Sequence, residues 1–258
     1  MVKVTFLGTC SGTEPKPDRH HCSLVVEVNG IYYWFDAGEN CSHKAYTSGI
    51  DVNRIRAVFI SHMHIDHIGG LANLMSVIRK VSKVTGTPHI NDNCYDIFVP
   101  DLKTFEAVRI VSGTPAKASF GVNNIPHEYS DGLVFEDENV RVTALHNTHL
   151  KETGEKGWHS YSFLIQVEGK RIVFSGDVGY PAEIEPYLEE PCDLCIMETG
   201  HHSVTRVCEY ACSKQVKKLA FTHHGREILR DVKAAEELIA TFDIDACICH
   251  DGDVIILD

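Results

Sequence analysis

Four potential metal ligands fall within six consecutive positions of this chain, immediately after a predicted strand. The segment Ser61-His62-Met63-His64-Ile65-Asp66-His67-Ile68-Gly69-Gly70 follows the apolar run 55–60, which is typical of a buried strand. Residues two apart project to the same side of an extended chain, so the first two histidines can reach one ion. As the chain turns into a helix, Asp66 and His67 can reach a second ion. This segment therefore predicts a metal centre at the end of a strand.

Three later segments place the same types of side chain after other predicted strands. They are Asn147-Thr148-His149, Phe174-Ser175-Gly176-Asp177 and Phe221-Thr222-His223. Histidine is abundant, with 16 in 258 residues, and neutral imidazole is the commonest metal ligand in proteins. The candidate ligands are His62, His64 and His149 for one ion, Asp66, His67 and His223 for a second, and Asp177 as a carboxylate between them. His146 is an alternative to His149, but it lies within or just beyond the end of its strand.

The charge of the chain excludes several kinds of partner. Its 24 Lys and Arg against 36 Asp and Glu give a formal net charge of −12, which opposes broad binding to nucleic acid or to anionic lipid. A small anionic substrate held by metal ions is compatible with this charge. The chain also has no stretch of about 18 apolar residues that could span a membrane. We therefore predict a small-molecule substrate, with no extended nucleic acid and no membrane as partner.

The length and the first residues indicate one intracellular domain. A chain of 258 residues can bury about three quarters of its unfolded surface, so we expect a single domain over residues 1–258. Residues 1–8 alternate like a strand and lack the apolar run of a signal peptide, which favours a cytoplasmic protein. The ten cysteines are then expected as reduced thiols, with no structural disulfide. A homodimer is compatible with the sequence, because symmetric dimers are the commonest oligomers.

Strands and helices alternate in a way that predicts an α/β fold with mixed sheets. Early strands form hairpins, one with a type I′ turn at Asn29-Gly30, and later strands alternate with helices. Segments 9–22, 82–95 and 112–132 are predicted loops that border the site and set specificity. The predicted strands are near 2–7, 22–28, 31–36, 55–60, 96–99, 139–145, 161–167, 171–175, 193–197, 218–222, 246–249 and 253–257. The predicted helices cover 69–81, 101–111, 182–190, 203–217 and 231–241, the last with Asp231 as N-cap.

These motifs resemble the metallo-β-lactamase superfamily over nearly the whole chain. In that family a His-x-His-x-Asp-His segment, a later His, a Gly-Asp turn and a final His bind two zinc or related ions, which implies the seven candidate ligands given above. The resemblance also implies a four-layer αββα sandwich of two mixed β-sheets flanked by helices. The blocks that resemble the RNase Z branch are Phe6-Leu7-Gly8-Thr9-Cys10-Ser11-Gly12, Trp34-Phe35-Asp36-Ala37-Gly38-Glu39, Phe174-Ser175-Gly176-Asp177 and Thr222-His223.

The resemblance to RNase Z has one clear departure. RNase Z enzymes carry a long arm that grips tRNA between the third-motif His and the Gly-Asp turn, but here His149 and Asp177 are only 28 positions apart (177 − 149). The branch also includes small cyclic-phosphate phosphodiesterases, whose C-terminal hairpin resembles Asp251-Gly252-Asp253-Val254-Ile255. Together with the negative charge, this favours a small or cyclic phosphodiester, or a short RNA, over tRNA.

The mechanism that this site suggests needs a proton acceptor and a proton donor. Two cations about 3.5 to 4 Å apart can share a hydroxide and stabilise the attacking and leaving oxygens at phosphorus. Asp66 is assigned two roles, as ligand and as acceptor of the nucleophile's proton. The leaving oxygen needs a proton, and the segment Met197-Glu198-Thr199-Gly200-His201-His202-Ser203 follows a strand. His202 is the first choice of donor, with Glu198 to orient it, and His201 and His224 are the alternatives.

We therefore predict a dinuclear metal-dependent hydrolase, specifically a phosphodiesterase that works by attack of a metal-bridged hydroxide. Two divalent ions per chain are expected, with Zn²⁺ first and Mn²⁺, Fe²⁺ or Ni²⁺ also suited to imidazole and carboxylate ligands. Two other functions fit the same residues. One is hydrolysis of a lactam, lactone or thioester, in which the same hydroxide attacks a carbonyl. The other is a metal-binding scaffold without catalysis, although seven intact ligand positions argue against it.

Overall fold

Two mixed β-sheets face each other in the computed structural model, which describes residues 1–12, 16–113, 121–150 and 158–258. The first sheet has the order β14-β1-β2-β3-β4-β5-β6 and the second β13-β12-β11-β10-β9-β8-β7. The strands of the first sheet are β1 (Val2–Gly8), β2 (Ser23–Val28), β3 (Ile31–Phe35), β4 (Ile55–Phe59), β5 (Cys94–Val99), β6 (Asn123–Glu128) and β14 (Val254–Leu257). Those of the second are β7 (Gly132–Glu136), β8 (Val140–His146), β9 (Tyr161–Val167), β10 (Lys170–Phe174), β11 (Leu194–Thr199), β12 (Leu219–His224) and β13 (Ala246–Ile248).

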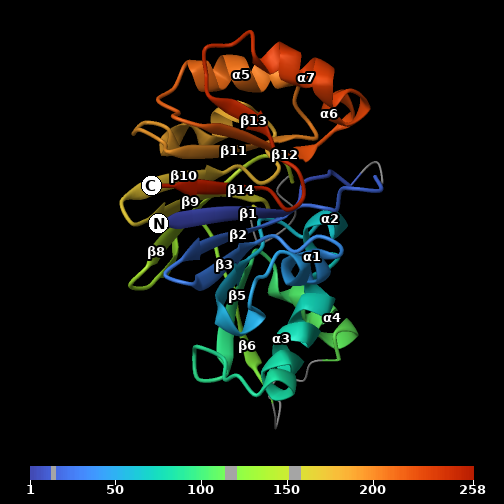
Figure 1. The fold of residues 1–258 in the computed structure, drawn as a ribbon. Helices are drawn as coiled ribbons and strands as arrows, with labels where there is room; N and C mark the ends of the chain where they lie inside the picture. Colours follow the sequence, from blue (N-terminus) through green and yellow to red (C-terminus); the bar gives the residue numbers. More distant parts are fainter. Residues whose placement is uncertain (13–15, 114–120, 151–157) are drawn as a thin grey trace.

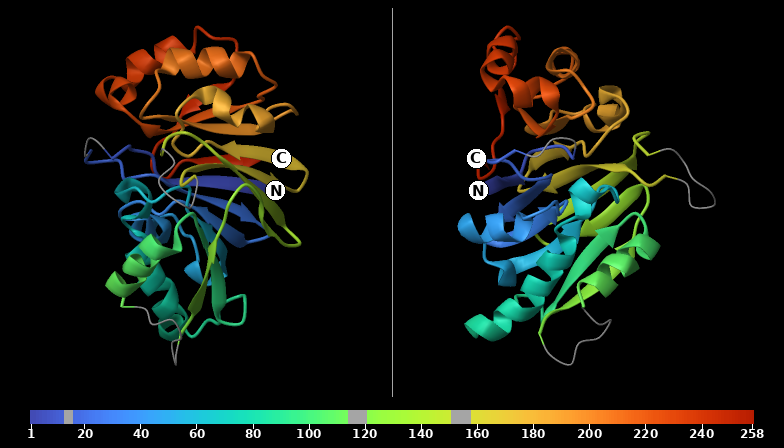
Figure 2. Two further views of the ribbon diagram at one scale, coloured as in Figure 1. Left: turned by 180° about the vertical axis from the view of Figure 1, so that it is seen from behind. Right: turned by 90° about the vertical axis from the view of Figure 1, so that its right-hand side faces the viewer.

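Helices cover the outer face of each sheet (Figures 1 and 2). The helices on the side of the first sheet are α1 (Cys41–Thr47), α2 (Ile65–Ile68), α3 (Leu71–Thr85) and α4 (Leu102–Val111), with the short 3₁₀ helix η1 (Val52–Arg54). Those on the side of the second sheet are η3 (Pro181–Tyr187), α5 (Val204–Cys212), α6 (Arg226–Arg230) and α7 (Val232–Ile239). This arrangement confirms the predicted αββα sandwich, in which each sheet buries one face on the other sheet and one on helices.

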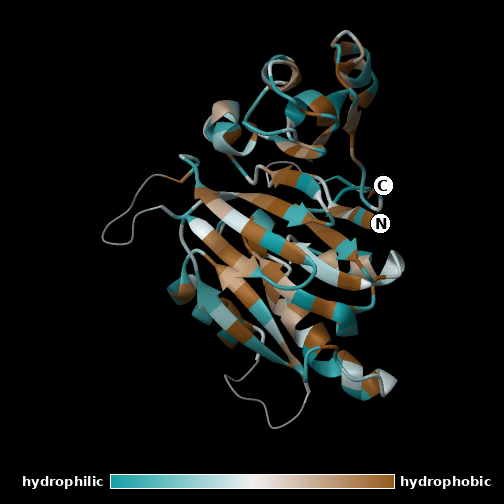
Figure 3. Cartoon of the chain, turned by 90° about the vertical axis from the view of Figure 1, so that its left-hand side faces the viewer, coloured by the Kyte–Doolittle hydropathy of each residue, from teal (hydrophilic) through white to brown (hydrophobic). Residues whose placement is uncertain are grey.

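Three layers of apolar side chains fill the sandwich. The central layer lies between the sheets and includes Phe35 of the first sheet and Phe163 of the second, whose ring centroids are 5.6 Å apart. One outer layer packs α3 and its neighbours on the first sheet, and the other packs α5 and α7 on the second. Figure 3 shows the apolar residues concentrated along the strands. Because every layer is buried, the relative positions of the strand ends are firmly fixed.

The strand directions bring the predicted site residues to one edge of the sandwich. Strands β10, β11 and β12 run parallel, and β8 has the same direction because it is antiparallel to β9, as β10 is. In the first sheet β1, β3 and β4 share one direction. The loops that leave these strands therefore gather at the same edges of their sheets. They carry the segments that the sequence marked, from residues 9–22 to the loop after β12.

One predicted specificity loop, and the first part of another, lie away from the site. Strands β4, β5 and β6 are parallel, so the residues that precede β5 and β6 enter these strands at the edge opposite the end of β4. The end of segment 112–132 lies at the other edge, where the Tyr129 hydroxyl donates a hydrogen bond to the Ile60 carbonyl at 2.6 Å. In addition, segment 112–132 contains β6, which was predicted as loop, and residues 114–120 lie outside the described residues. The strand was missed because its sequence Asn-Asn-Ile-Pro-His-Glu is mostly polar and largely not buried, and because Pro126 is unusual inside a strand.

Other local predictions had mixed outcomes. Asp231 caps α7, with its side chain accepting a hydrogen bond from the Ala234 amide at 3.0 Å, and Asn29 and Gly30 both have the positive φ of a type I′ turn. Residues 182–190 were predicted as a helix, and the chain forms the shorter 3₁₀ helix η3 there, which contains Pro186. No helix in the described part of the chain combines the length and the apolar character that crossing a bilayer requires.

Candidate metal centre

Three histidines and one aspartate meet where β4, β8 and β10 end. Nδ1 of His64 lies 3.0 Å from Nε2 of His62 and 3.2 Å from Nε2 of His149. The same two Nε2 atoms each lie 3.7 Å from Oδ2 of Asp177. We call this group, His62, His64, His149 and Asp177, the first cluster. Its members come from segments up to 115 positions apart (177 − 62), and the structure brings together the four residues that the sequence analysis proposed around one ion.

A second cluster lies directly beside the first and contains Asp66, His67, Asp177 and His223. Oδ1 of Asp177 lies 3.3 Å from Nε2 of His67 and 3.3 Å from Nδ1 of His223. Oδ2 of Asp66 lies 3.1 Å from Nε2 of His223 and 3.7 Å from Nε2 of His67. Asp177 thus directs one carboxylate oxygen to each cluster, and the two clusters share this residue.

A β-bulge directs His223 into the second cluster. In the pairing of β11 with β12, Glu198 is opposite Thr222 and Thr199 is opposite His224, so His223 is the extra residue, and its φ is +46°. Bulges of this kind often re-aim a side chain next to a functional site. The adjacent His224 is fully buried elsewhere, with Nε2 2.8 Å from the carbonyl oxygen of Cys249. The structure therefore does not bring His224 to the clusters.

The atoms of the second cluster leave room for an ion rather than satisfying one another. Among the described residues, three of the buried polar atoms without a hydrogen-bond partner are Nε2 of His67, Oδ1 of Asp177 and Nδ1 of His223. Buried polar atoms are rarely left unpaired in native proteins. Ligands about 2.0 to 2.2 Å from a tetrahedral ion lie about 3.3 to 3.6 Å from each other, which matches the separations above. The residues present therefore fit divalent cations.

The clustered side chains perturb one another's ionisation. Burial lowers the pKa of His67, but the carboxylates of Asp177 and Asp36 outweigh this and raise the pKa well above its ordinary value. Burial raises the pKa of Asp177, yet the charges on His223 and His67 hold that pKa well below its ordinary range. Burial and the charge on His67 lower the pKa of His62. The site thus keeps an ionised carboxylate between imidazoles, as cation binding requires.

Asp36 is a site residue whose role the sequence analysis missed. It is fully buried at the end of β3 with φ of +56°. Its Oδ2 lies 2.7 Å from Nδ1 of His67 and accepts a hydrogen bond from the Ser61 hydroxyl, and its Oδ1 accepts one from the Ser61 amide. A carboxylate on Nδ1 fixes the ring so that Nε2 would face a cation held by the second cluster. Two features of the sequence could have indicated this role: Asp36 follows an apolar strand, and it lies within one of the blocks that resemble RNase Z.

The loop 9–22 reaches Asp66 from the first sheet. The amide of Gly12 donates a hydrogen bond to Oδ2 of Asp66 at 2.9 Å. A Cβ on residue 12 would lie 2.8 Å from the Asp66 carboxylate, so only glycine allows this approach. Of the predicted specificity loops, this one does border the candidate centre, and its residues 13–15 lie outside the described residues.

The predicted acid-base segment places His201, rather than His202, against the clusters. Nδ1 of His201 lies 3.1 Å from Oε1 of Glu198 and 3.8 Å from Oδ2 of Asp177. The His201 ring centroid is 4.7 Å from that of His149. In contrast, Nε2 of His202 donates a hydrogen bond to the carbonyl of Val178 at 2.9 Å. His202 therefore holds a neighbouring loop, and His201 faces the centre.

Glu198 lies behind His201 and is almost completely buried. Its Oε2 accepts a hydrogen bond from the His201 amide at 2.9 Å. Burial raises the pKa of Glu198, but its hydrogen bonds with His201 and His223 lower the pKa to about 2. The hydrogen bond with Glu198 in turn raises the pKa of His201 above its ordinary value. This pair favours a protonated imidazole at the edge of the centre.

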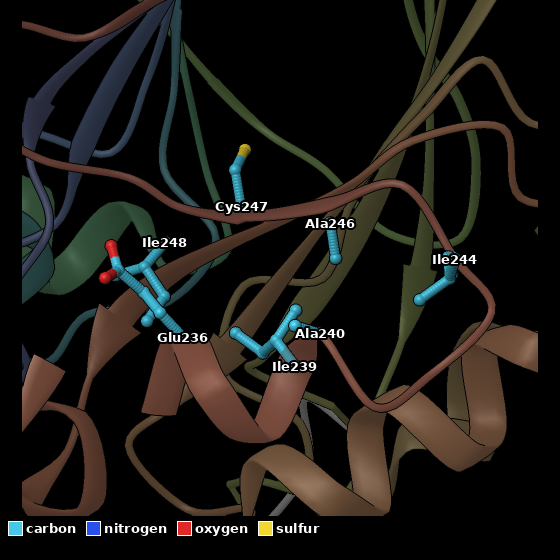
Figure 4. A pocket seen from close by; sticks show the side chains of 7 residues that line it. All are labelled: Glu236, Ile239, Ala240, Ile244, Ala246, Cys247 and Ile248. Atoms are coloured by element: carbon cyan, nitrogen blue, oxygen red, sulfur yellow. The ribbon is translucent and has the colours of Figure 1, made fainter. Parts of the chain in front are cut away.

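A hollow of about 490 Å³ opens beside His201. Its lining residues are Thr199, Gly200, His201, His202, Ser203, Arg226 and Glu227. A separate hollow of about 270 Å³ lies between α7 and β13, and its lining includes the Glu236 carboxylate beside several apolar side chains (Figure 4). Its only sulfur-bearing residue, Cys247, points to the opposite side of its strand from Ala246. None of the clustered histidines lines that second hollow, whereas His201, which faces the candidate centre, lines the first.

The alternative third-motif ligand, His146, lies outside both clusters. Its Nδ1 is 2.6 Å from Oδ2 of Asp131, and its ring stacks on Trp158 with centroids 4.5 Å apart. His149 instead enters the first cluster, because the amide oxygen of Asn147 accepts the His149 backbone N–H at 3.1 Å and turns the chain. Asn147 thus helps to direct His149 into the first cluster, because its side chain stabilises a local turn.

The two-sheet sandwich and the His and Asp clusters at its edge define a metal-dependent hydrolase of the metallo-β-lactamase fold. A family model described as "Anti-Pycsar protein Apyc1" matches residues 2–240. The chain belongs to this family.

Other relatives match this chain over almost their whole length. A protein named ribonuclease Z from Methanothermobacter thermautotrophicus is 24% identical over 306 residues, which cover 95% of this chain and 94% of the relative. The crystal structure of human tRNase Z, short form, is 22% identical, with a TM-score of 0.72 and coverage of 99% of both chains. A diphosphatase of the PhnP family is 16% identical, with a TM-score of 0.70, and the match covers 100% of this chain and 98% of that one. These comparisons confirm the predicted RNase Z-like branch of the superfamily.

Proposed function

We propose that the chain is a phosphodiesterase that holds two divalent cations and cleaves a small or cyclic phosphodiester. The observation that carries this proposal is the position of Asp177, which places one oxygen in each cluster. His62, His64 and His149 would hold one cation, and Asp66, His67 and His223 the other. Zinc suits this number of imidazole and carboxylate ligands, and Mn²⁺, Fe²⁺ or Ni²⁺ fit the same atoms.

The cations, when bound, supply positive charge that polarises the phosphodiester and favours ionisation of an attacking water. Asp66 accepts the proton of that water, because its Oδ2 faces the second cluster while the Gly12 amide and His223 hold the carboxylate in place. Asp36 keeps Nε2 of His67 turned toward the centre. The buried position of these groups excludes bulk water from the reacting atoms.

His201 donates the proton that the leaving oxygen needs, in place of His202, the first choice from sequence. It is the histidine of this segment that both contacts Glu198 and faces Asp177. Its side chain is 43% exposed, so it can meet a substrate that enters from the hollow. Glu198 then acts as a positioning residue, because it accepts hydrogen bonds from the backbone N–H and the ring of the same histidine.

Three observations support a small substrate. Only 28 positions separate His149 from Asp177 (177 − 149), and the hairpin β9–β10 occupies 12 of them (7 + 5), which leaves little length for an RNA-gripping arm. The net charge is −12, which opposes binding of long polyanions. The neighbouring hollow measures about 490 Å³, within the usual size range of small-molecule sites.

Turnover of three phosphodiesters by the zinc- or manganese-loaded protein tests the proposal. The substrates are bis(p-nitrophenyl) phosphate, a cyclic nucleotide and an RNA with a 3′ trailer. We expect hydrolysis of the first two, little or none of the RNA, and no activity in D177N. Inactivity on all three with both metals bound would contradict the proposal, and hydrolysis of nitrocefin, a lactone or a thioester in its place would indicate acyl hydrolysis.

A further inference from the structure

One carboxylate, that of Glu183, joins the two loops that carry His149 and Asp177. Oε1 of Glu183 accepts the backbone N–H of Thr148 at 3.0 Å and also the Thr148 hydroxyl. Oε2 accepts the backbone N–H groups of Gly179 at 2.8 Å and Tyr180 at 3.2 Å. A carboxylate has about four lone-pair positions, so these four donors saturate it. Glu183 is partly exposed, yet its oxygens accept hydrogen bonds from three backbone N–H groups and one hydroxyl of the protein.

The same two loops also contact each other next to this carboxylate, at Thr148 and Gly179. A Cβ added to Gly179 would collide with Oγ1 of Thr148 and would lie 3.3 Å from Oε1 of Glu183. Residue 179 must therefore be glycine for the loops to approach this closely. Thr148 precedes His149 by one position, and Gly179 follows Asp177 by two. The contact thus lies within two residues of ligands on either side of the first cluster.

Separate contacts hold the Asp177 loop from its other sides. The carbonyl of Asp177 is 3.4 Å from the Ser160 hydroxyl, and the carbonyl of Val178 accepts the hydrogen bond from His202. Those contacts fix the loop to the start of β9 and to the segment after β11. The carbonyl of Ser160 also accepts the backbone N–H of Asn147 at 2.9 Å, which is a second link, through β9, between the two loops. Glu183 differs from Ser160 because a single side-chain carboxylate binds the backbone of both loops, next to His149 and Asp177.

We propose that Glu183 is a positioning residue that presets the first cluster, by locking the His149 loop against the Asp177 loop before a cation binds. The inference rests on the proposed function, because it assigns the first cluster to a cation. Its physical basis is preorganisation: groups that orient ligands reduce the ordering that binding would otherwise require. Of the residues in the second cluster, only Asp177 lies on a loop that Glu183 holds. Loss of Glu183 therefore weakens mainly the binding of the cation in the first cluster.

The test compares wild type with E183Q, E183A and the matched control E189Q. Glu189 is an exposed carboxylate that follows the same 3₁₀ helix and lies outside both ligand loops. Zinc affinities are measured by competition with a chelating indicator, and hydrogen exchange of the backbone amides is measured on the metal-free proteins. We expect E183Q and E183A to weaken one of two zinc affinities by about 10- to 100-fold, with faster exchange at Thr148, Gly179 and Tyr180. E189Q should match wild type in both measurements.

The possible outcomes separate this inference from the proposed function. Two zinc ions in wild type with both affinities unchanged in folded E183Q would overturn the role of Glu183 alone. Equal weakening of both affinities, together with faster exchange throughout the protein, would show a general structural role and would also overturn it. A wild-type protein that binds no zinc would overturn the proposed function, and the role of Glu183 with it. Urea unfolding of each metal-free variant establishes that it is folded.

Discussion

The carboxylate of Asp36 and the imidazole of His67 face each other in the fully buried layer behind the candidate metal centre, with Oδ2 2.7 Å from Nδ1. Because the proton of the ring is drawn to Nδ1, Nε2 presents a lone pair to the second cluster. The pair comes from segments 31 positions apart (67 − 36), and it fixes the orientation of a ring that belongs to the second cluster. The geometry of the second cluster thus depends on a residue that does not enter it.

Replacement of Asp36 tests this relationship. In D36N the amide NH₂ can donate to Nδ1 of His67, which moves the ring proton to Nε2 and toward the cation position. We expect zinc affinity at one site to fall by about 10- to 100-fold, as measured by competition with a chelating indicator. The control is D243N, an exposed aspartate between α7 and β13. Unchanged zinc affinities in D36N would contradict the assigned role.

Leaving-group dependence distinguishes His201 from His202. General acid catalysis contributes about 10²- to 10⁴-fold, so H201A should lose that much kcat on a substrate that releases an alkoxide. The loss should be much smaller with bis(p-nitrophenyl) phosphate, because p-nitrophenolate leaves without a proton. H202A removes the hydrogen bond to the Val178 carbonyl and should affect both substrates alike. If H202A shows the leaving-group dependence and H201A does not, the assignment is wrong.

Metal removal should weaken the fold. The clusters bring together ionised carboxylates and buried imidazoles whose orphaned atoms gain partners only from a cation. A cation that binds the folded chain alone stabilises it by about 2.7 kcal/mol when its free concentration is 100 times Kd. We expect urea unfolding curves to shift to higher denaturant as free zinc rises, and to return after chelation. Identical curves with and without zinc would argue against cation binding.

His89 should make the stability depend on pH below neutrality. Burial lowers the pKa of the His89 imidazole to about 4, while in the unfolded chain it titrates near 6.5. Between these values the unfolded chain binds a proton that the folded chain does not, so the free energy of unfolding falls as pH drops from about 6.5 to 4. H89Q cannot titrate, and its unfolding free energy should depend less steeply on pH over this range. Parallel pH profiles for wild type and H89Q would contradict this prediction.

Much of the fold could be predicted because its core strands are continuous apolar runs. The segments Tyr161–Val167 and Leu194–Thr199 are almost entirely buried, and the sequence marks both. Strand β6 is different, because it is largely not buried. Its pairing with β5 depends on backbone hydrogen bonds, which leave no pattern in the side chains from which the strand could be predicted. The short helix Cys41–Thr47 was also missed, since seven residues are too few to establish a helical period.

The candidate site residues could be identified because each lies at or just beyond the end of a strand that is readable in the sequence. The residues that orient these site residues could not be predicted, because Asp36 and Glu183 contact groups that are 31 and 35 positions away in the sequence (67 − 36 and 183 − 148). No local pattern encodes such contacts. His201 and His202 are adjacent in a loop, and only the fold shows that one faces Asp177 while the other faces the Val178 carbonyl.

Anomalous scattering from crystals of the zinc-loaded protein tests the central claim most directly. With data collected at the zinc absorption edge, the account predicts two peaks about 3.5 to 4 Å apart, one beside each carboxylate oxygen of Asp177. The peak at Oδ2 should lie among His62, His64 and His149, and the peak at Oδ1 should lie between His67 and His223. A single peak, or none in this part of the map, would contradict the two-cation site on which the proposed chemistry depends.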